Sequence, residues 1–324
     1  MREVGQPLPA LQDFAPDHAD ATDELLAGLS SRRKSIPTRL LYDARGVELF
    51  EAICETDEYY LRRTELHILR ENVREMAALL GPDCLIIEYG SGMGLKTRLL
   101  LDHLSSPVGY VPIEISREVL RQSTQSLRER YPGLRVLPVC ADYTSHYELP
   151  PTPREPARRA VFFPGSTIGN FERDEGLDFI RHIAETVGPR GRLLVGVDLH
   201  KDTETLERAY DDASGTTAQF ELNALAHLNR EFGAEFRLEL FEYCSFYNKK
   251  LQRIEMYLVS LEPQRVRVAG SVIEFARQER ILMEYAQKYT LESFRCFAAE
   301  AGFSVERVWV DDRSLFSIQY LARD

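Results

Sequence analysis

The sequence predicts an α/β fold, in which a mostly parallel sheet is wrapped by helices on both faces and closed by a C-terminal antiparallel hairpin. Between residues 84 and 199, short apolar runs alternate with amphipathic stretches, which is typical of such a sheet. A helical segment at 290–301 then precedes two apolar runs at 303–311 and 315–321, as in a hairpin added to a mixed sheet. With 324 residues and 44% hydrophobic content, the chain can bury one large core or two modest ones.

The part of the chain before this sheet is expected to hold an arm and a long helix. Residues 1–20 are polar and punctuated by prolines, so we expect a loosely held arm there. A helix is predicted over 61–80, because apolar side chains recur at three- and four-residue spacings and Gly81-Pro82 follows.

Strands and helices alternate in the central part of the chain. Strands are expected at 84–89, 108–115, 134–140, 159–163 and 192–199. Helices are expected at 95–104, 116–130 and 173–187, with Pro132-Gly133 and Gly188-Pro189 stopping the last two. Because strands alternate with helices along this segment, the strands are expected to be parallel.

The regular alternation of strands and helices ends after residue 200. Residues 203–236 are expected to be largely helical, and 236–247 and 253–261 to form adjacent strands. We therefore expect residues from about 201 to 287 to form an inserted or appended substrate region.

Composition limits the partners of the protein. A formal net charge of -11 argues against nonspecific binding to a nucleic-acid backbone or an anionic membrane. No stretch approaches the roughly 18 apolar residues of a membrane span, and the N-terminal residues lack the apolar core of a signal peptide. The five cysteines and seven histidines are scattered without metal-ligand spacing, which is typical of reduced thiols in a cytoplasm. We therefore expect a cytoplasmic protein that binds no nucleic acid, membrane or metal, and we also expect a monomer.

A glycine-rich turn, Glu88-Tyr89-Gly90-Ser91-Gly92-Met93-Gly94, links the first of these strands to the next helix. Glycines at this place let the backbone turn tightly and approach a ligand closely. The strand-end acid Glu88 precedes the first glycine, and the spacing G-x-G-x-G differs from the G-x-G-x-x-G of dinucleotide sites. The turn therefore predicts a nucleoside-like ligand at Gly90 and Gly92, with a plain strand–helix turn as the alternative.

Two further acids end the following strands. Glu114 comes about 20 residues after the glycine turn, where a carboxylate accepts hydrogen bonds from both ribose hydroxyls of a nucleoside. The alternative is a carboxylate that stabilises the start of the next helix. Asp142 ends the third strand, at a place suited to the adenine amino group, although spacing alone does not decide this.

Several longer strings point to a known family. They are Leu41-Tyr42-Asp43-Ala44-Arg45-Gly46, Glu58-Tyr59-Tyr60, Gly90-Ser91-Gly92-Met93-Gly94-Leu95-Lys96-Thr97, Pro164-Gly165-Ser166-Thr167-Ile168-Gly169-Asn170-Phe171, Ala209-Tyr210-Asp211-Asp212 and Arg253-Ile254-Glu255-Met256. These strings run in the family's order from about residue 30 to the C-terminus, and in them the chain resembles the histidine Nα-methyltransferases of ergothioneine biosynthesis. Those enzymes use S-adenosylmethionine to form hercynine, the betaine of histidine.

The resemblance implies a fold and a division of the chain. A Rossmann-like class I methyltransferase domain, comprising residues 63–200 and 288–324, would bind S-adenosylmethionine. A second α+β domain, comprising residues 1–62 and 201–287, would recognise the amino-acid substrate. The substrate would then bind between the two, where ligands of such sheets commonly lie.

The resemblance also implies the residues that contact the cofactor. They are Glu88, Gly90, Gly92, Lys96, Glu114, Asp142 and Tyr143. The family usually has aspartate in place of Glu114, a difference that keeps the charge and lengthens the reach of the side chain.

A second set of residues is implied for the substrate. Tyr42, which packs near the methyl donor, and Asn170 are expected to be catalytic. Contacts to the α-amino and α-carboxylate groups are implied for Tyr59, Gly165, Asn170 and Tyr210, and side-chain recognition for Met256 and Glu284. From the residues alone, Asn170 can equally cap the helix near 173, the tyrosines and Met256 can be core residues, and Glu284 can be a surface acid.

One position departs from the family pattern. Family members that take histidine usually carry Glu-x-Ser at the imidazole end, whereas this chain has Glu284-Tyr285-Ala286. Glu284 can still accept a hydrogen bond from an imidazole N–H, and the missing hydroxyl costs about 1 kcal/mol or is replaced by water. We therefore predict Nα-methylation of histidine. Because of Ala286, the specificity of the protein for histidine is an open question.

Three alternatives stay open. The first is the same chemistry on another amino acid, such as a tryptophan-like substrate, which Ala286 suggests and Met256 with Glu284 argue against. The second is a non-catalytic protein that binds S-adenosylmethionine, which the presence of Tyr42, Asn170 and Tyr210 disfavours. The third is a nicotinamide dehydrogenase, which the G-x-G-x-G spacing disfavours.

Overall fold

A large mixed sheet forms one half of the computed structural model, which describes residues 11–92, 94–145 and 147–323. Within these residues its order is β1-β4-β3-β2-β5-β6-β13-β12. The strands are β1 (Gln12–Asp13), β2 (Cys84–Tyr89), β3 (Gly109–Glu114), β4 (Val139–Cys140), β5 (Arg158–Phe163), β6 (Arg192–Asp198), β12 (Phe303–Val310) and β13 (Phe316–Arg323). Strands β1 to β6 pair in parallel, and β13 pairs antiparallel with both β6 and β12. The predicted fold class, with its C-terminal antiparallel hairpin, is confirmed.

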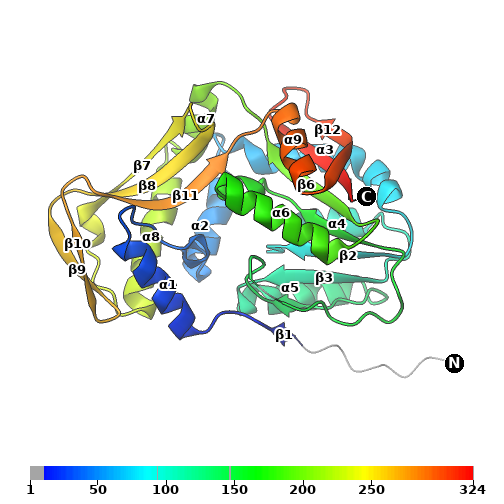
Figure 1. Cartoon of the computed structure of the whole chain (residues 1–324), viewed down its shortest axis with the longest axis horizontal. Helices are drawn as coiled ribbons and strands as arrows, with labels where there is room; N and C mark the ends of the chain where they lie inside the picture. The colour runs from blue at the N-terminus through cyan, green and yellow to red at the C-terminus, as the bar shows by residue number, and fades with distance from the viewer. Residues whose placement is uncertain (1–10, 93, 146, 324) are drawn as a thin grey trace.

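Helices cover both faces of this sheet because its central strands are apolar on both sides. All six residues of β2 are buried, as expected for a strand covered twice. The helices are α3 (Tyr60–Leu80), α4 (Leu95–Leu101), α5 (Arg117–Arg130), α6 (Arg173–Val187) and α9 (Leu291–Glu300). Helices α6 and α9 pack into one core with Ile87 and Val161, whereas α3 and α4 pack into the other with Ile86 and Ala160. Figure 1 shows α6 and α9 in front of the sheet.

A smaller sheet lies beside the large one, on the left of Figure 1. Its antiparallel order is β11-β8-β7, formed by β7 (Phe241–Asn248), β8 (Arg253–Ser260) and β11 (Arg280–Gln287). A separate hairpin of β9 (Gln264–Val268) and β10 (Ser271–Phe275) extends from it. The helices of this region are α1 (His18–Ser30), α2 (Ala44–Cys54), α7 (Thr203–Tyr210) and α8 (Thr216–Glu231), with short 3-10 turns η1 (Thr38–Leu41) and η3 (Leu238–Leu240).

The expected loose arm over residues 1–20 is wrong where the chain is described. Gln12 and Asp13 pair with β4, and both carboxylate oxygens of Asp13 accept hydrogen bonds from Arg117, at 2.6 and 3.1 Å. Helix α1 begins at His18, because the Asp17 side chain caps it by accepting from the Asp20 N–H at 2.9 Å. Residues 1–10 lie outside the described part of the chain.

The stretch expected to be largely helical, residues 203–236, is helical in two parts, α7 and α8, with a break between them. The Asp212 carboxylate accepts hydrogen bonds from the N–H groups of Thr216 and Thr217, at 2.9 and 2.7 Å, and so starts a new helix. Gly215 precedes that helix with φ of 70°, a conformation that suits glycine. This break places Tyr210 at the end of α7 and Glu221 on α8.

Two strand expectations also need correction. The strand expected over 134–140 is only Val139–Cys140, preceded by a single bridge from Val136 to Tyr110. The β9–β10 hairpin was not predicted, although both of its strands show the alternating burial of a one-sided sheet. As for membranes, the described helices include none that combines the length and the apolarity needed to cross one.

Candidate functional site

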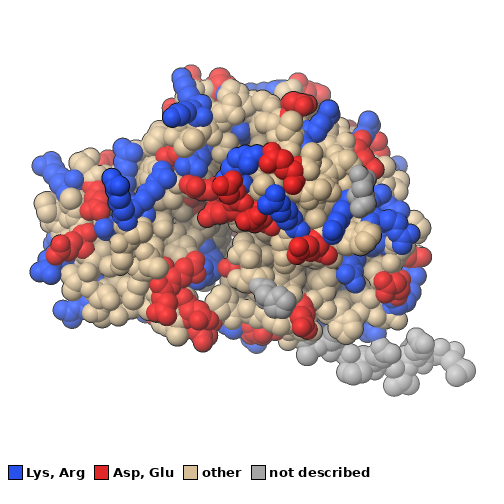
Figure 2. All heavy atoms as spheres, in the orientation of Figure 1, with Lys and Arg blue, Asp and Glu red and all other residues tan. Residues whose placement is uncertain are grey.

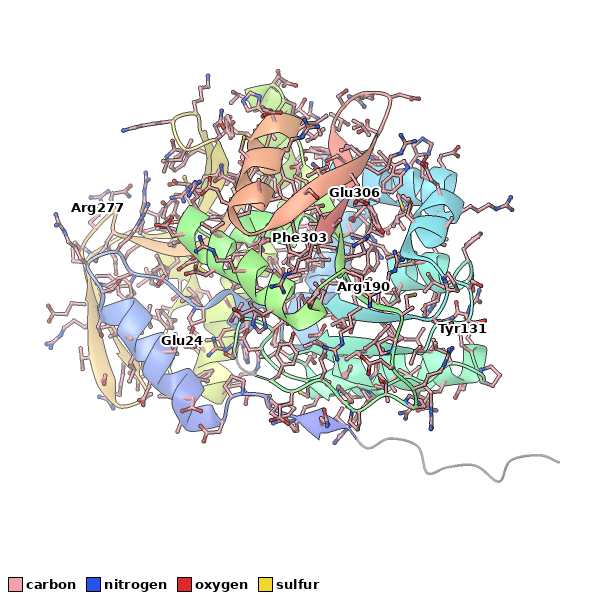
Figure 3. All side chains as sticks on the ribbon, turned by 45° about the vertical axis from the view of Figure 1, so that its right-hand side comes forward. Glu24, Tyr131, Arg190, Arg277, Phe303 and Glu306 are labelled. Atoms are coloured by element: carbon pink, nitrogen blue, oxygen red, sulfur yellow. The ribbon has the colours of Figure 1, made fainter. Side chains whose placement is uncertain are left out.

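A cavity of about 910 Å³ lies between the carboxyl ends of the parallel strands and the smaller sheet. From the large sheet it is lined by the segments after β2, β3, β4 and β5, and from the other side by residues of α2, α8, β8 and β11. Figure 2 shows the molecule hollowed near the middle of this face, with acidic side chains around the hollow. The acidic residues of the lining include Glu24, Glu175 and Asp178, and Figure 3 labels Glu24 on α1.

The glycine turn forms one wall of the cavity. Gly90 and Gly92 line it with φ values of 64° and 47°, which glycine adopts without strain. The Gly92 N–H donates to Glu114 Oε2 and the Ser116 N–H donates to Glu114 Oε1, both at 3.1 Å. These two bonds fix the Glu114 carboxylate at the end of β3, facing the same space as the turn. Burial raises the pKa of Glu114, and the backbone N–H groups partly oppose that rise.

Glu88 lies beneath the turn rather than in the cavity lining. Its side chain is buried, and Oε2 accepts hydrogen bonds from the hydroxyls of Thr97 and Tyr110. Burial raises the pKa of Glu88 to about 7, against these hydrogen bonds, which lower it. Glu88 therefore ties β2 to α4 and β3, and contacts the cavity only through the turn that it supports.

Asp142 and Tyr143 line the cavity beyond β4. Asp142 Oδ1 accepts from the N–H of Thr144 at 2.9 Å and from its hydroxyl at 2.6 Å. The Tyr143 ring stacks on Tyr89 with centroids 5.5 Å apart, and its edge lies 3.9 Å from where a Cβ on Gly90 would stand. Tyr143 is thus held against the glycine turn by aromatic packing.

Lys96 acts on the site through a residue that the sequence did not reveal. Its ammonium forms an ion pair with Glu65 of α3, which is 1% exposed. The Glu65 carboxylate accepts the Gly165 N–H at 2.8 and 3.0 Å, and so holds the turn after β5 at the cavity wall. Gly165 lines the cavity, and its N–H is bonded within the protein.

Aromatic and polar side chains surround the opposite end of the cavity. The Tyr42 ring packs against the rings of Phe50 and Phe220, with centroids 5.8 and 5.5 Å apart. The Tyr59 ring packs against that of Tyr210, with centroids 6.1 Å apart. The lining here also includes Asn170, Met256 and Glu284.

Strand pairing brings Met256 and Glu284 together. The two residues lie opposite each other in the β8–β11 ladder, and Asn170 Nδ2 donates to Glu284 Oε1 at 3.4 Å. Ala286 pairs with Ile254 two residues further along, is buried in the core and does not line the cavity.

A buried ionic network orients the Tyr210 hydroxyl. Lys288 Nζ donates to Tyr210 Oη at 2.8 Å and to Asp198 Oδ2 at 2.6 Å. Asp198 also accepts from Lys201 at 2.7 Å and from Tyr60 at 2.8 and 2.9 Å. Burial alone would raise the pKa of Asp198, but the two ammonium groups hold it below its ordinary value. Since Tyr210 accepts from an ammonium, its own proton is free to be donated into the cavity.

The sequence-predicted residues therefore fall into two groups. Those that line the one cavity are Tyr42, Tyr59, Gly90, Gly92, Glu114, Asp142, Tyr143, Gly165, Asn170, Tyr210, Met256 and Glu284. Glu88, Lys96 and Ala286 lie outside its lining.

Glu221 of α8 lines the cavity and was not predicted. It lies on the buried stripe of its helix, with Ala224, Leu225 and Leu228 at the following three-, four- and seven-residue spacings. An acid within such an apolar stripe is the sequence signal that points to it.

Comparison with known proteins agrees with this arrangement. Residues 21–323 match the family model described as "Histidine-specific methyltransferase, SAM-dependent". The chain is 39% identical to a histidine N-alpha-methyltransferase of Mycolicibacterium smegmatis, over 94% of this chain and 97% of that one. It is 36% identical to one of Mycobacterium tuberculosis, over 94% and 96% of the two chains. It is also 27% identical to a 4-dimethylallyltryptophan N-methyltransferase of Aspergillus fumigatus, over 89% of each chain.

The family match spans nearly the whole chain, and it includes both the strand ends and the smaller sheet that together line the cavity. The chain belongs to the S-adenosylmethionine-dependent, histidine-specific methyltransferase family.

Proposed function

We propose that this protein transfers methyl groups from S-adenosylmethionine to the α-amino nitrogen of L-histidine, ending at the betaine hercynine. The observation that carries the proposal is that one cavity joins the glycine turn and Glu114 to the group formed by Tyr59, Tyr210 and Glu284. A nucleoside and an amino acid would thus meet in a single enclosed space, as a transfer between them requires.

The first end of the cavity suits the cofactor. Gly90 and Gly92 let the backbone approach it, and Glu114 presents a fixed carboxylate that suits two ribose hydroxyls. Asp142 would accept from the adenine amino group, with Tyr143 packed beside it. Glu88 and Lys96 would act indirectly, by supporting the turns after β2 and β5. When bound, the cofactor supplies an electrophilic methyl group on a sulfonium.

The other end suits an α-amino acid. The Tyr210 proton would be donated to the α-carboxylate, together with contacts from Tyr59 and Asn170. The Gly165 carbonyl would orient the amine, which must be neutral to attack. Tyr42 would pack near the reacting atoms. Positioning is the main task of the protein in such a displacement, and solvent can take the released proton.

A substrate screen tests the proposal. Purified protein is incubated with S-adenosylmethionine and each of the twenty amino acids, and the products are read by mass spectrometry. We expect mono-, di- and trimethylated histidine as the products. Absence of any methylated histidine would overturn the proposal.

A tryptophan-like substrate is the second candidate. It is favoured by the name of the Aspergillus relative and disfavoured by the carboxylate of Glu284 in the cavity, whereas Ala286, which suggested it in the sequence, lies outside the cavity lining. The values of kcat/KM for histidine and tryptophan, measured with the same preparation, decide between the two.

We further propose how the chain divides its tasks. Residues 63–200 and 288–324 would bind the cofactor, and residues 1–62 and 201–287 would bind the amino acid. We also expect a cytoplasmic monomer that needs neither metal nor nucleic acid. Light scattering of the purified protein tests whether it is a monomer, and activity after dialysis against a chelator tests whether it needs a metal.

A further inference from the structure

Glu221 is a buried carboxylate for which the protein supplies no hydrogen-bond partner. Its side chain is 1% exposed, and neither Oε1 nor Oε2 has a partner among the described residues. It nevertheless lines the cavity. A carboxyl group held out of water without a partner is costly, so its presence beside a cavity indicates that a ligand provides the missing donor.

The polar neighbours of Glu221 use their donors elsewhere. The Tyr243 hydroxyl of β7 donates to the Tyr210 carbonyl at 2.6 Å. On α8 itself, the Asn223 amide donates to Asp43 at 2.7 Å, and the Thr217 hydroxyl donates to Asp212 at 2.6 Å.

Among the described residues the charged neighbour of Glu221 is an acid, and Arg39 of η1, which also lines the cavity, is paired with Glu24. Tyr42, which follows η1, faces Glu221 as a neutral phenol whose pKa burial raises. Asp43, at the start of α2, is bound to Asn223 and Arg230. From η3, Glu239 is exposed to solvent. The charged group that faces Glu221 is Glu284 of β11, a second acid.

Two carboxyl groups that influence each other electrostatically therefore line the cavity. Burial raises the pKa of Glu284 to about 8, and burial together with Glu284 raises that of Glu221. Two such groups keep at least one proton between them near neutral pH, because like charges this close disfavour double ionisation. The pair then offers one acceptor and one donor to a ligand.

A neutral imidazole is complementary to this arrangement, because it has one N–H donor and one acceptor nitrogen. We propose that Glu221 is a second specificity residue, and that Glu221 and Glu284 each form a hydrogen bond with one ring nitrogen of histidine. This inference rests on the proposed function. The protonated carboxyl group of the pair donates to the acceptor nitrogen of the ring, and the ionised carboxylate accepts from the ring N–H. Glu221 thereby supplies a second polar partner for the ring from α8, whereas Ala286 of β11 lies outside the cavity lining.

Two substitutions at one position test this. In Glu221→Leu the second hydrogen bond is lost, and we expect the Kd and KM of histidine to rise about tenfold or more. In Glu221→Gln the amide donates to the ring without needing a shared proton, so we expect values within about threefold of the unmodified protein at pH 7. Calorimetry of histidine binding in the presence of S-adenosylhomocysteine gives the Kd independently of turnover.

The pH profile separates recognition from a structural role. For the unmodified protein, the affinity for histidine should fall as pH rises above about 8, where the carboxyl pair loses its proton. Glu221→Gln should flatten this fall, whereas Glu231→Gln, at an exposed acid at the end of the same helix, should leave it unchanged.

The outcomes are distinct. If Glu221→Leu binds histidine as tightly as the unmodified protein, Glu221 forms no hydrogen bond with the imidazole ring and the inference fails. If Glu221→Leu and Glu221→Gln lose affinity equally with an unchanged pH profile, its role is structural, and the inference fails while the proposed function stands. If the unmodified protein neither binds nor methylates histidine, both fail.

Discussion

The Tyr210 hydroxyl oxygen accepts a hydrogen bond from Lys288 Nζ. The proton of this hydroxyl is therefore left to be donated to another group. Lys288 is 1% exposed and also contacts Asp198, so it cannot turn away without leaving a charge unpaired. Under the proposed function the lysine is thus a positioning residue, which would act on the substrate through the tyrosine.

A double-mutant cycle tests this coupling. We expect Lys288→Met and Tyr210→Phe each to raise the KM of histidine, by about tenfold or more, since each removes a hydrogen bond to a charged group or its orientation. Because both act through one hydroxyl, the double variant should be little worse than Tyr210→Phe alone. Steady-state kinetics on the four proteins, with Tm values to confirm folding, provide the measurement. Additive losses in KM would show that Lys288 acts independently of Tyr210.

The 3-10 turn η2 (Thr167–Asn170) is held directly against strand β11. A Cβ on Gly169 would stand 2.9 Å from the Gln287 carbonyl oxygen and 3.1 Å from its nitrogen, so only glycine allows this approach. The contact sets Asn170 beside Glu284, although Glu284 belongs to the smaller sheet and Asn170 to the turn that follows β5 of the large one.

Gly169→Ala should therefore disturb both stability and substrate binding. We expect a loss of about 1–3 kcal/mol in the free energy of unfolding, since the added methyl group meets backbone atoms that cannot turn aside. The KM of histidine should also rise as Asn170 moves away from Glu284. Urea unfolding and steady-state kinetics measure the two effects. Gly133→Ala is the matched control, because nothing lies within 4 Å of its Cβ position, and an equal loss there would contradict the explanation.

The helices show what sequence periodicity can and cannot predict. The helix expected over 61–80 is Tyr60–Leu80, and those expected over 116–130 and 173–187 are Arg117–Arg130 and Arg173–Val187. Their apolar stripes are long, and glycine or proline follows each of them. In contrast, the break before α8 depends on the Asp212 cap, which is a three-dimensional contact rather than a change in hydrophobic pattern.

The candidate site was predictable where it belongs to the sheet. Carboxyl ends of parallel strands share one edge, so the sequence could place Gly90, Glu114 and Asp142 together. The opposite end combines residues from α8, β8 and β11, whose meeting depends on how the smaller sheet packs on the large one. There only the family resemblance indicated Met256 and Glu284, and Glu221 was missed.

The stability of the whole molecule should depend on pH through Glu88. Its pKa is raised from 4.5 to about 7, chiefly by burial, so the folded chain binds a proton that the unfolded chain releases. This contribution is fully present below pH 4.5 and is lost as pH rises through about 7.

Glu88→Gln removes this titration and keeps an oxygen that can accept from Thr97 and Tyr110. We therefore compare the free energy of unfolding of the variant with that of the unmodified protein at pH 5 and at pH 8. The difference between them should shift in favour of the variant as pH rises, whatever its value at pH 5. Urea unfolding of both proteins at the two pH values measures this. A difference in unfolding free energy that stays constant with pH would show that Glu88 does not change protonation on folding.

The short strand β1 limits how far the two sides of the cavity can separate. It anchors Gln12 and Asp13 to the edge of the large sheet, while α1, which starts at His18, packs beside β10 and contributes Glu24 to the cavity lining (Figure 1). Residues 14–17 join the two as a tether, which at full extension reaches about 17 Å from Asp13 to His18. Any widening of the cavity at this edge must therefore stay within that length or separate β1 from β4.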